Sequence, residues 1–230
     1  MSTTYSLSAN TFRSSILSGI AVGIAGWGYL ACCSKGLEAG YDAKWFEVVG
    51  AVLFSFGLLT VVNYKLKLYT GTAGFVSLRK EDGSCRFFRA IAELLFILLG
   101  NITGCMLVAL LLRCSPISGL EQAQAQALLI LDRRLDLGPL KAGALAIGCG
   151  FIMTTVVTFA REGKPLALLF GVPLFIYCGF PHCLADAFYY MAAPLSCTGE
   201  HLWEIVALYP CLVIGNFIGC NLYRFLAPKE

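Results

Sequence analysis

The hexapeptide Gly100-Asn101-Ile102-Thr103-Gly104-Cys105 has a near copy later in the chain, Gly215-Asn216-Phe217-Ile218-Gly219-Cys220. The two copies lie 115 residues apart (215 − 100 = 115), which is half of the 230-residue chain. Small residues at this spacing let membrane helices approach closely, so shared packing requirements could also produce such a match. The offset of half the chain favours a duplicated half over two independent packing motifs.

Both hexapeptides lie in long stretches that contain no Asp, Glu, Lys or Arg. Six such stretches, 17 to 21 residues long, run through the chain: Ser14–Ser34, Val48–Tyr64, Leu94–Leu112, Ala142–Ala160, Pro165–Ala185 and Ile205–Tyr223. Roughly 20 apolar residues cross the hydrocarbon core of a bilayer. Hydrophobic residues make up 58% of the chain and charged residues 13%, against about 25% charged in soluble domains. We therefore predict an all-α polytopic membrane protein with six transmembrane helices, the first being a retained span rather than a cleaved signal peptide.

Three spans per half mean that the third and sixth spans cross in opposite directions, as an inverted 3+3 repeat. We predict one transmembrane channel domain over residues 1–230, with halves 1–115 and 116–230. Inverted repeats place broken helices and a binding site near the midplane. The positive-inside rule puts both termini in the cytoplasm, because that side has nine Lys and Arg against six. The nine include Arg79, Lys80, Arg86 and Lys229.

Helix-breaking sequences occur once in each half. Lys67–Gly74 follows the second span with two glycines, and the fifth stretch contains Cys178-Gly179-Phe180-Pro181-His182. Broken backbone at membrane depth is tolerated only where protein or a water-filled cavity satisfies its polar groups. At the 115-residue offset Lys67 corresponds to His182 (182 − 67 = 115). The broken second and fifth helices should therefore meet across a pseudo-two-fold axis.

The side chains at the breaks have functional and structural interpretations. His182 is the one histidine inside a membrane stretch, and an ionisable residue there suggests function, although it could also be a packing residue. Asp186 lies one helical turn on, where it could bond the imidazole or snorkel. Lys67 could attract anions or snorkel, and Thr70 offers a hydroxyl. We expect Lys67 to lower, and Asp186 to raise, the proton affinity of His182, while Glu93 is interpreted as a helix-start charge.

Other functions find little support in the sequence. The eleven cysteines lie mostly in spans without paired CxxC motifs, so packing is favoured over metal or redox chemistry. A net charge of +3 is too small and dispersed for nucleic-acid binding. No cofactor or metal is expected, and no enzyme motif is present. Residues 118–139 are predicted to form an amphipathic or surface helix, rather than a span, that bridges the halves.

At these motifs the chain resembles the formate/nitrite transporter family. The family's Glu-Leu-Phe-Thr-Gly loop corresponds to Lys67–Gly71, its two Gly-Asn pairs to Asn101 and Asn216, and its Gly-Phe-Glu-His-Ser-x-Ala-Asn break to Gly179–Asp186. These four motifs occur in the same order as in the family, and the match extends over almost the whole length of the chain. The departures from the family pattern are Lys67 and Pro181 for glutamates, and Asp186 and Gly150 for asparagines. The family's vestibule lysine could correspond to Arg134 or to Lys141.

The resemblance implies an aquaporin-like protomer with its own pore, assembled as a homopentamer in the inner (plasma) membrane. It implies transport of small monovalent anions of weak acids, such as formate, nitrite or hydrosulfide, often with a proton. The expected pore residues are His182, Thr70, Lys67, Asp186, Leu68, Tyr69, Phe180, Asn101 and Asn216. An aquaporin-type pore for neutral solutes is disfavoured because neither break contains Asn-Pro-Ala. An intramembrane enzyme or redox protein would have to use His182 with Asp186 or Cys183, and Cys183 would point elsewhere on a helix.

Overall fold

A computed structural model describes residues 7–40, 43–75, 87–114 and 120–226, which form nine helices and no strand. The first half contains α1 (Ala9–Glu38), α2 (Ala43–Asn63), α3 (Tyr69–Ala73) and α4 (Phe87–Arg113). The second half contains α5 (Leu120–Arg161), α6 (Leu166–Tyr177), α7 (Cys183–Ala192), α8 (Leu195–Glu200) and α9 (Leu202–Leu226). The described chain is therefore all-α, as predicted.

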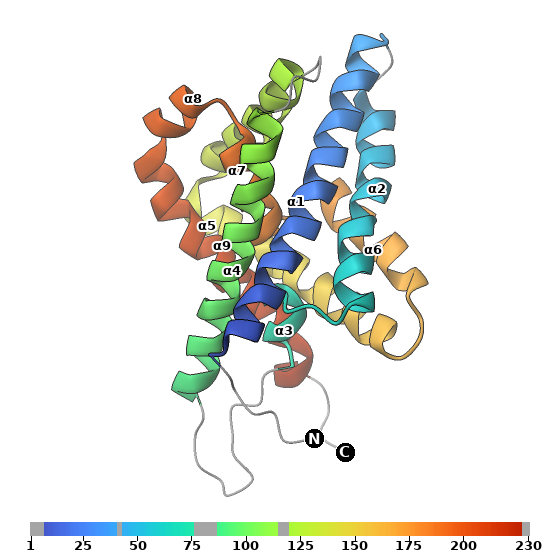
Figure 1. Cartoon of the computed structure of the whole chain (residues 1–230), viewed down its shortest axis with the longest axis vertical. Coiled ribbons are helices and arrows are strands. Elements are labelled where there is room, and N and C mark those ends of the chain that lie inside the picture. The colour runs from blue at the N-terminus through green and yellow to red at the C-terminus, as the bar shows by residue number, and fades with distance from the viewer. Residues whose placement is uncertain (1–6, 41–42, 76–86, 115–119, 227–230) are drawn as a thin grey trace, which may run out of the picture.

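Six crossings can be followed along the long axis of the molecule. Five described helices, α1, α2, α4, α5 and α9, are long and apolar enough to span a bilayer. The shorter α6 and α7 run in the same direction and make the remaining crossing together (Figure 1). The start of α1 and the end of α9 lie at the same end of the molecule, and α4 and α9 run in opposite directions (Figure 1). This arrangement confirms the inverted architecture.

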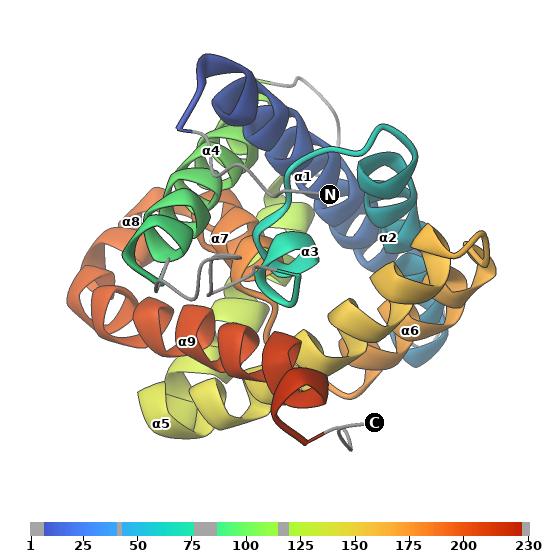
Figure 2. The ribbon, with the colours of Figure 1, turned by 90° about the horizontal axis from the view of Figure 1, so that it is seen from below.

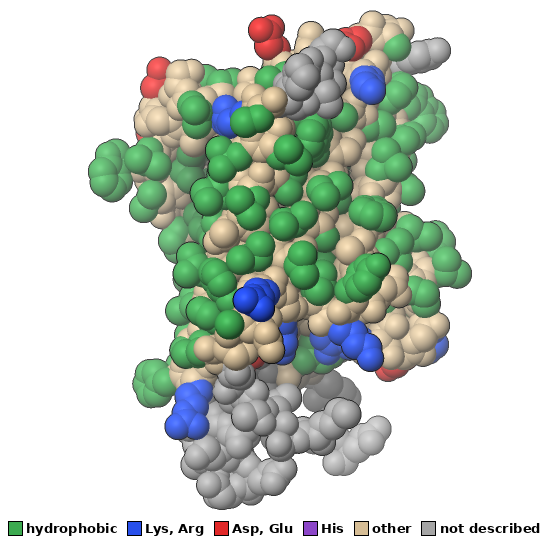
Figure 3. Space-filling model, in the orientation of Figure 1, with side chains coloured by type: hydrophobic (Ala, Val, Ile, Leu, Met, Phe, Trp, Pro, Cys, Tyr) green, Lys and Arg blue, Asp and Glu red, His purple; other side chains and the backbone are tan. Residues whose placement is uncertain are grey.

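The surface agrees with a membrane location. Hydrophobic side chains cover the face between the two ends, and most of the Lys, Arg, Asp and Glu side chains gather toward those ends (Figure 3). An apolar band between two charged rims is the surface expected of a chain solvated by lipid. Four members of the positive-inside tally, Arg79, Lys80, Arg86 and Lys229, lie outside the described residues.

The two hexapeptides build two equivalent helix crossings. α1 crosses α4 so closely that a Cβ on Gly19 would lie 2.0 Å from the carbonyl oxygen of Asn101. In the second half, α5 crosses α9, and a Cβ on Gly150 would lie 2.2 Å from the carbonyl oxygen of Asn216. Only glycine permits this backbone approach, which is how small residues drive membrane-helix association. The repeat therefore encodes helix packing in both halves.

Helix α5 is divided by Gly138, whose φ of 71° and ψ of 165° interrupt the helical geometry. Residues 120–138 form a segment that we call the α5 arm, and residues 139–161 make the fourth crossing. The arm was predicted to be an amphipathic or surface helix, and it is amphipathic, because one of its faces is buried through Ala123, Ala127 and Leu131. The arm therefore packs into the helix bundle along this face, and Arg134 is the one charged residue of the arm that is not exposed.

The short helix α3 lies at the centre of the bundle. Viewed from the end where α1 begins and α9 ends, α3 is enclosed by the longer helices (Figure 2). Its residues Tyr69, Thr70, Gly71 and Ala73 are all buried. The first break therefore brings polar backbone and a hydroxyl into the core, where each polar group needs a partner.

Candidate functional site

Asn101 on α4 holds the first break by its side-chain amide. Its Oδ1 accepts a hydrogen bond from the backbone N–H of Tyr69 at 2.9 Å. Its Nδ2 donates to the carbonyl oxygens of Ser15 at 2.8 Å and Lys67 at 2.9 Å. The bonds to Tyr69 and Lys67 satisfy backbone groups of the break that no helix supplies with a partner, and the bond to Ser15 ties the break to α1.

Asn216 on α9 makes the same three bonds at the second break. Its Oδ1 accepts from the N–H of Cys183 at 2.9 Å. Its Nδ2 donates to the carbonyl oxygens of Ala146 at 2.8 Å and Pro181 at 3.0 Å. Both asparagines were predicted as site residues, and in the structure each anchors the backbone of a break.

The hydrogen bonds of the asparagines correct the predicted register of the repeat. Tyr69 corresponds to Cys183 (183 − 69 = 114), and Lys67 corresponds to Pro181 (181 − 67 = 114). The pairing of Lys67 with His182 is therefore wrong by one residue, because the second half has one more residue between its break and its asparagine. The counterpart of His182 is Leu68, and both are helix N-cap residues with extended backbone.

The two breaks meet at a hydrogen bond between Thr70 and His182. Thr70 Oγ1 lies 3.0 Å from His182 Nε2, and both side chains are buried. His182 Nδ1 accepts a hydrogen bond from the backbone N–H of Ala185 at 3.3 Å, which caps α7. The neutral imidazole therefore holds its proton on Nε2 and donates it to the threonine. Two residues 112 positions apart are thus brought together.

The last residue of each hexapeptide also reaches the break of the opposite half. Cys105 Sγ donates to the carbonyl oxygen of Leu184 at 3.6 Å, and Cys220 Sγ donates to that of Thr70 at 3.4 Å. These thiols are buried and unpaired with other cysteines. They support the packing role predicted for the cysteines and fasten the two halves to each other at the centre.

Asp186 does not bond the imidazole of His182, contrary to the expectation. Its Oδ1 accepts from Arg134 Nε on the α5 arm at 3.2 Å, and the two side chains are 1% and 12% exposed. Arg134 Nη1 also donates to the carbonyl oxygen of Gly179 at 2.9 Å. Because α7 begins directly after His182, the imidazole caps its own helix while Asp186, one turn on, lies against the arm.

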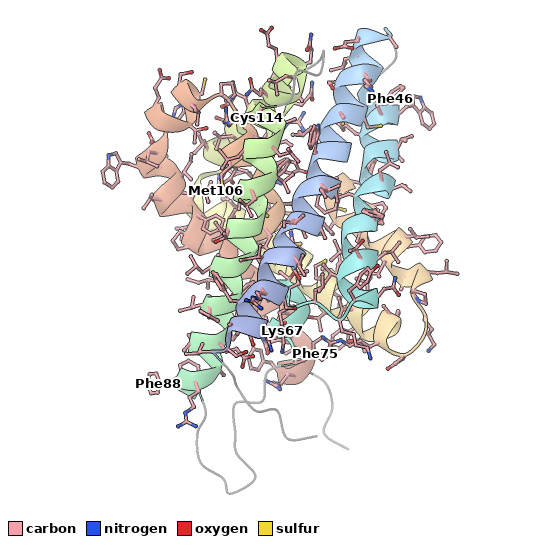
Figure 4. All side chains as sticks on the ribbon, viewed as in Figure 1. Phe46, Lys67, Phe75, Phe88, Met106 and Cys114 are labelled. Atoms are coloured by element: carbon pink, nitrogen blue, oxygen red, sulfur yellow. The ribbon has the colours of Figure 1, made fainter. Side chains whose placement is uncertain are left out.

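Lys67 has a different partner as well. Its Nζ lies 3.8 Å from Glu93 Oε1, with the lysine side chain 44% exposed and the glutamate 10%. Figure 4 shows Lys67 toward the end of the molecule where α1 begins and α9 ends. Lys67 and Asp186, which were predicted to set the proton affinity of His182 together, therefore each have another ionic partner in the structure. Glu93, interpreted as a helix-start charge, is instead a buried residue of α4 that neutralises Lys67.

Each break is also held by an arginine of α5. Arg134 of the arm bonds Gly179 in the second break, and Arg161 at the other end of α5 donates to the carbonyl oxygen of Gly71 at 3.0 Å. The Arg161 guanidinium also lies 3.9 Å from the centre of the Phe75 ring. Sequence reasoning missed Arg161, although its position at the end of an apolar stretch marks it as a helix-end cation.

A cavity of about 100 Å³ lies beside His182, between α1, the α5 arm, α6 and α7. Its charged lining residues are Arg133, Arg134 and Asp186, and Phe180 contributes an apolar wall. The remaining predicted residues, Leu68 and Tyr69, are buried at the first break. Two guanidiniums therefore line the same cavity as the imidazole. Of the two candidates for the vestibule cation, Arg134 lines this cavity.

The profile of the formate/nitrite transporter family matches residues 3–227 of the chain. The chain belongs to the formate/nitrite transporter family. Relatives include the transporter YrhG of Bacillus subtilis, 24% identical over 79% of this chain and 71% of its own length. The formate channel FocA of Haemophilus influenzae is 22% identical over 94% of this chain and 77% of its own.

Solved structures of this family have the same fold. A pentameric formate channel with formate bound superposes with a TM-score of 0.78 at 22% identity, covering 94% of both chains. An ion channel of the family superposes with a TM-score of 0.73 at 21% identity, covering 95% of this chain and 90% of its own. The resemblance and the multi-pass membrane architecture are thereby confirmed. The departures at Lys67, Pro181, Asp186 and Gly150 are accommodated within the family fold.

Proposed function

We propose that the protein is a channel or proton-coupled transporter for small monovalent anions of weak acids. The observation that carries this function is the buried hydrogen bond between Thr70 and His182, which joins the two helix breaks at the centre of the protomer. The names of its relatives, among them formate channels, support formate and similar anions as substrates. The domain comprises residues 1–230, with inverted halves 1–115 and 116–230.

The cavity and the imidazole suggest how an anion crosses. Arg133 and Arg134 attract the anion to the cavity, and His182 supplies or accepts the proton beside it. The neutral acid then passes the side chains of Leu68 and Tyr69, which are buried at the first break, and Phe180, which lines the cavity. An uncompensated charge there would cost several kcal/mol, so proton transfer is what makes passage fast.

The proposed oligomeric state rests on the comparison with solved structures. A homopentamer in the plasma membrane with both termini in the cytoplasm is supported by the pentameric structural relative and by the excess of Lys and Arg on the terminal side. The mass of the protein particle in lipid nanodiscs tests the number of subunits directly. Five copies per particle are expected, and a monomer or tetramer would contradict the assembly.

Reconstitution into proteoliposomes tests the transport function. Uptake of formate, nitrite, hydrosulfide and acetate should exceed that of empty liposomes and increase with an inward proton gradient. Swelling in glycerol or urea serves as the control for a neutral-solute pore and should match empty liposomes. Glycerol permeation without anion uptake would contradict the proposed function and favour an aquaporin-like pore.

A further inference from the structure

The five-residue helix α3, which carries Thr70, is fastened at its C-terminal end by the second half of the chain. The last four carbonyl groups of an α-helix have no partner within the helix. In α3 these are the carbonyl oxygens of residues 70–73, and that of Thr72 accepts from the backbone N–H of Phe75 at 2.9 Å. The other three accept hydrogen bonds from side chains of α5 and α9.

Arg161 supplies the strongest of these three attachments. Cys220 and Asn221 of α9 donate to carbonyl oxygens of α3 at 3.4 Å and 3.3 Å. Arg161 Nη2 donates to the carbonyl oxygen of Gly71 at 3.0 Å. The arginine bond is the shortest of the three and has the charged donor, and such bonds are about twice as strong as those between neutral groups.

The chain that follows α3 lies directly against the same two helices. A Cβ on Gly74 would lie 2.5 Å from the carbonyl oxygen of Cys220 on α9 and 2.7 Å from Thr154 Oγ1 on α5. The φ of −75° and ψ of −12° at Gly74 are open to any residue, so packing is what requires glycine here. The Arg161 guanidinium also lies 3.9 Å from the centre of the Phe75 ring, which adds a cation–π contact.

We propose that Arg161 is a positioning residue that holds the Thr70 hydroxyl against the imidazole of His182, an inference that rests on the proposed function. Gly71 directly follows Thr70, so the guanidinium acts on the residue next to the one that bonds the imidazole. A helix of five residues has little stability of its own. Without the guanidinium α3 is held more weakly, and the hydroxyl spends less time at its distance of 3.0 Å from His182 Nε2.

A double-mutant cycle with Thr70 tests this role. Arg161→Met should lower the maximal rate of formate uptake in proteoliposomes about fivefold, as expected for the loss of one hydrogen bond. The formate concentration at half-maximal uptake should not change. The double variant Arg161→Met/Thr70→Val should match Thr70→Val alone, because no hydroxyl remains to be positioned. Arg161→Lys keeps a charged donor and should restore most of the rate.

Gly74→Ala disturbs the same attachment without changing any charge. Its methyl group would lie too close to the carbonyl oxygen of Cys220, so α3 has to move away from α9. Formate uptake should fall, and Thr70→Val should again remove the difference. This second cycle keeps the proposal open to contradiction even where Arg161→Met does not assemble, since an additive effect of Gly74→Ala would show that the attachment does not act through Thr70.

Arg89→Met is the matched control. Arg89 is exposed near the start of α4, and this start lies at the end of the molecule where α5 and α9 end (Figure 1). The variant removes the same charge as Arg161→Met and should take up formate like the wild type. Particle size by chromatography confirms that each variant assembles.

Arg161 is exposed, so attraction of anions by its charge is the alternative that the cycle excludes or reveals. Attraction would raise the half-saturating formate concentration, fade at high salt and persist in the Thr70→Val background. That result, or unchanged uptake by Arg161→Met, would overturn the positioning role and leave formate transport intact. Absence of formate uptake by assembled wild-type protein would instead overturn the proposed function, and the role of Arg161 with it.

Discussion

At the first break an asparagine of α4 bonds the backbone on both sides of Leu68, and at the second an asparagine of α9 does so on both sides of His182. The three bonds made by Asn101 match those of Asn216 in type and length. The residue between the two bonded backbone positions differs. It is the apolar Leu68 at the first break and His182, whose imidazole is bonded to Thr70, at the second.

This difference separates what folds the protein from what it does. Both breaks need the same backbone support, because unpaired polar groups are costly in the membrane in either half. The titratable group is needed once. The duplicated residues therefore form the framework, and the unequal residues at corresponding positions supply the chemistry.

The largest effect is expected from removing either anchor. Asn101→Leu and Asn216→Leu each delete three hydrogen bonds and leave buried backbone groups unpaired, which should lower the free energy of unfolding by on the order of 3 kcal/mol or more. Thermal unfolding in detergent measures this. Thr103→Val, a change at a partly exposed residue on the same helix as Asn101, should be nearly neutral. Tolerance of one asparagine substitution but not the other would break the equivalence of the two breaks.

A smaller effect is expected where the breaks touch. Thr70→Val keeps the shape of the side chain but removes the hydroxyl that bonds His182. Formate uptake should fall about tenfold, as expected for the loss of one hydrogen bond, while assembly is unchanged. Thr70→Ser should restore most of the uptake. If the Thr70→Val variant takes up formate as fast as the Thr70→Ser variant, the hydrogen bond between the breaks does not contribute to transport.

The smallest effect is expected at Lys67. Its ion pair with Glu93 is long, and the lysine is nearly half exposed, so the pair is worth at most about 1 kcal/mol. Lys67→Met should change formate uptake less than about twofold and leave the pH of maximal uptake unchanged. A clear upward movement of that pH would restore the electrostatic coupling to His182 that the sequence offset suggested.

The sequence predicted the fold well because apolar stretches, glycines and asparagines each have a role defined by the membrane. The meeting of Thr70 with His182 follows from two breaks at corresponding places. The ion pairs did not follow, since Glu93 lies 26 residues beyond Lys67 (93 − 67 = 26) and Arg134 lies in an arm that its composition assigns to the surface. A single residue added between the second break and Asn216 was enough to shift the inferred partner of His182.

The pH dependence of formate uptake by His182→Asn tests the role of the imidazole most directly. Asparagine can still bond Thr70 but cannot exchange a proton. Uptake at neutral pH should fall about tenfold or more, the range that positioned proton transfer contributes. The difference in formate uptake between the variant and the wild type should become smaller at acidic pH, where the substrate arrives already protonated. Equal uptake by wild type and variant at every pH, with both proteins assembled, would show that His182 is a packing residue.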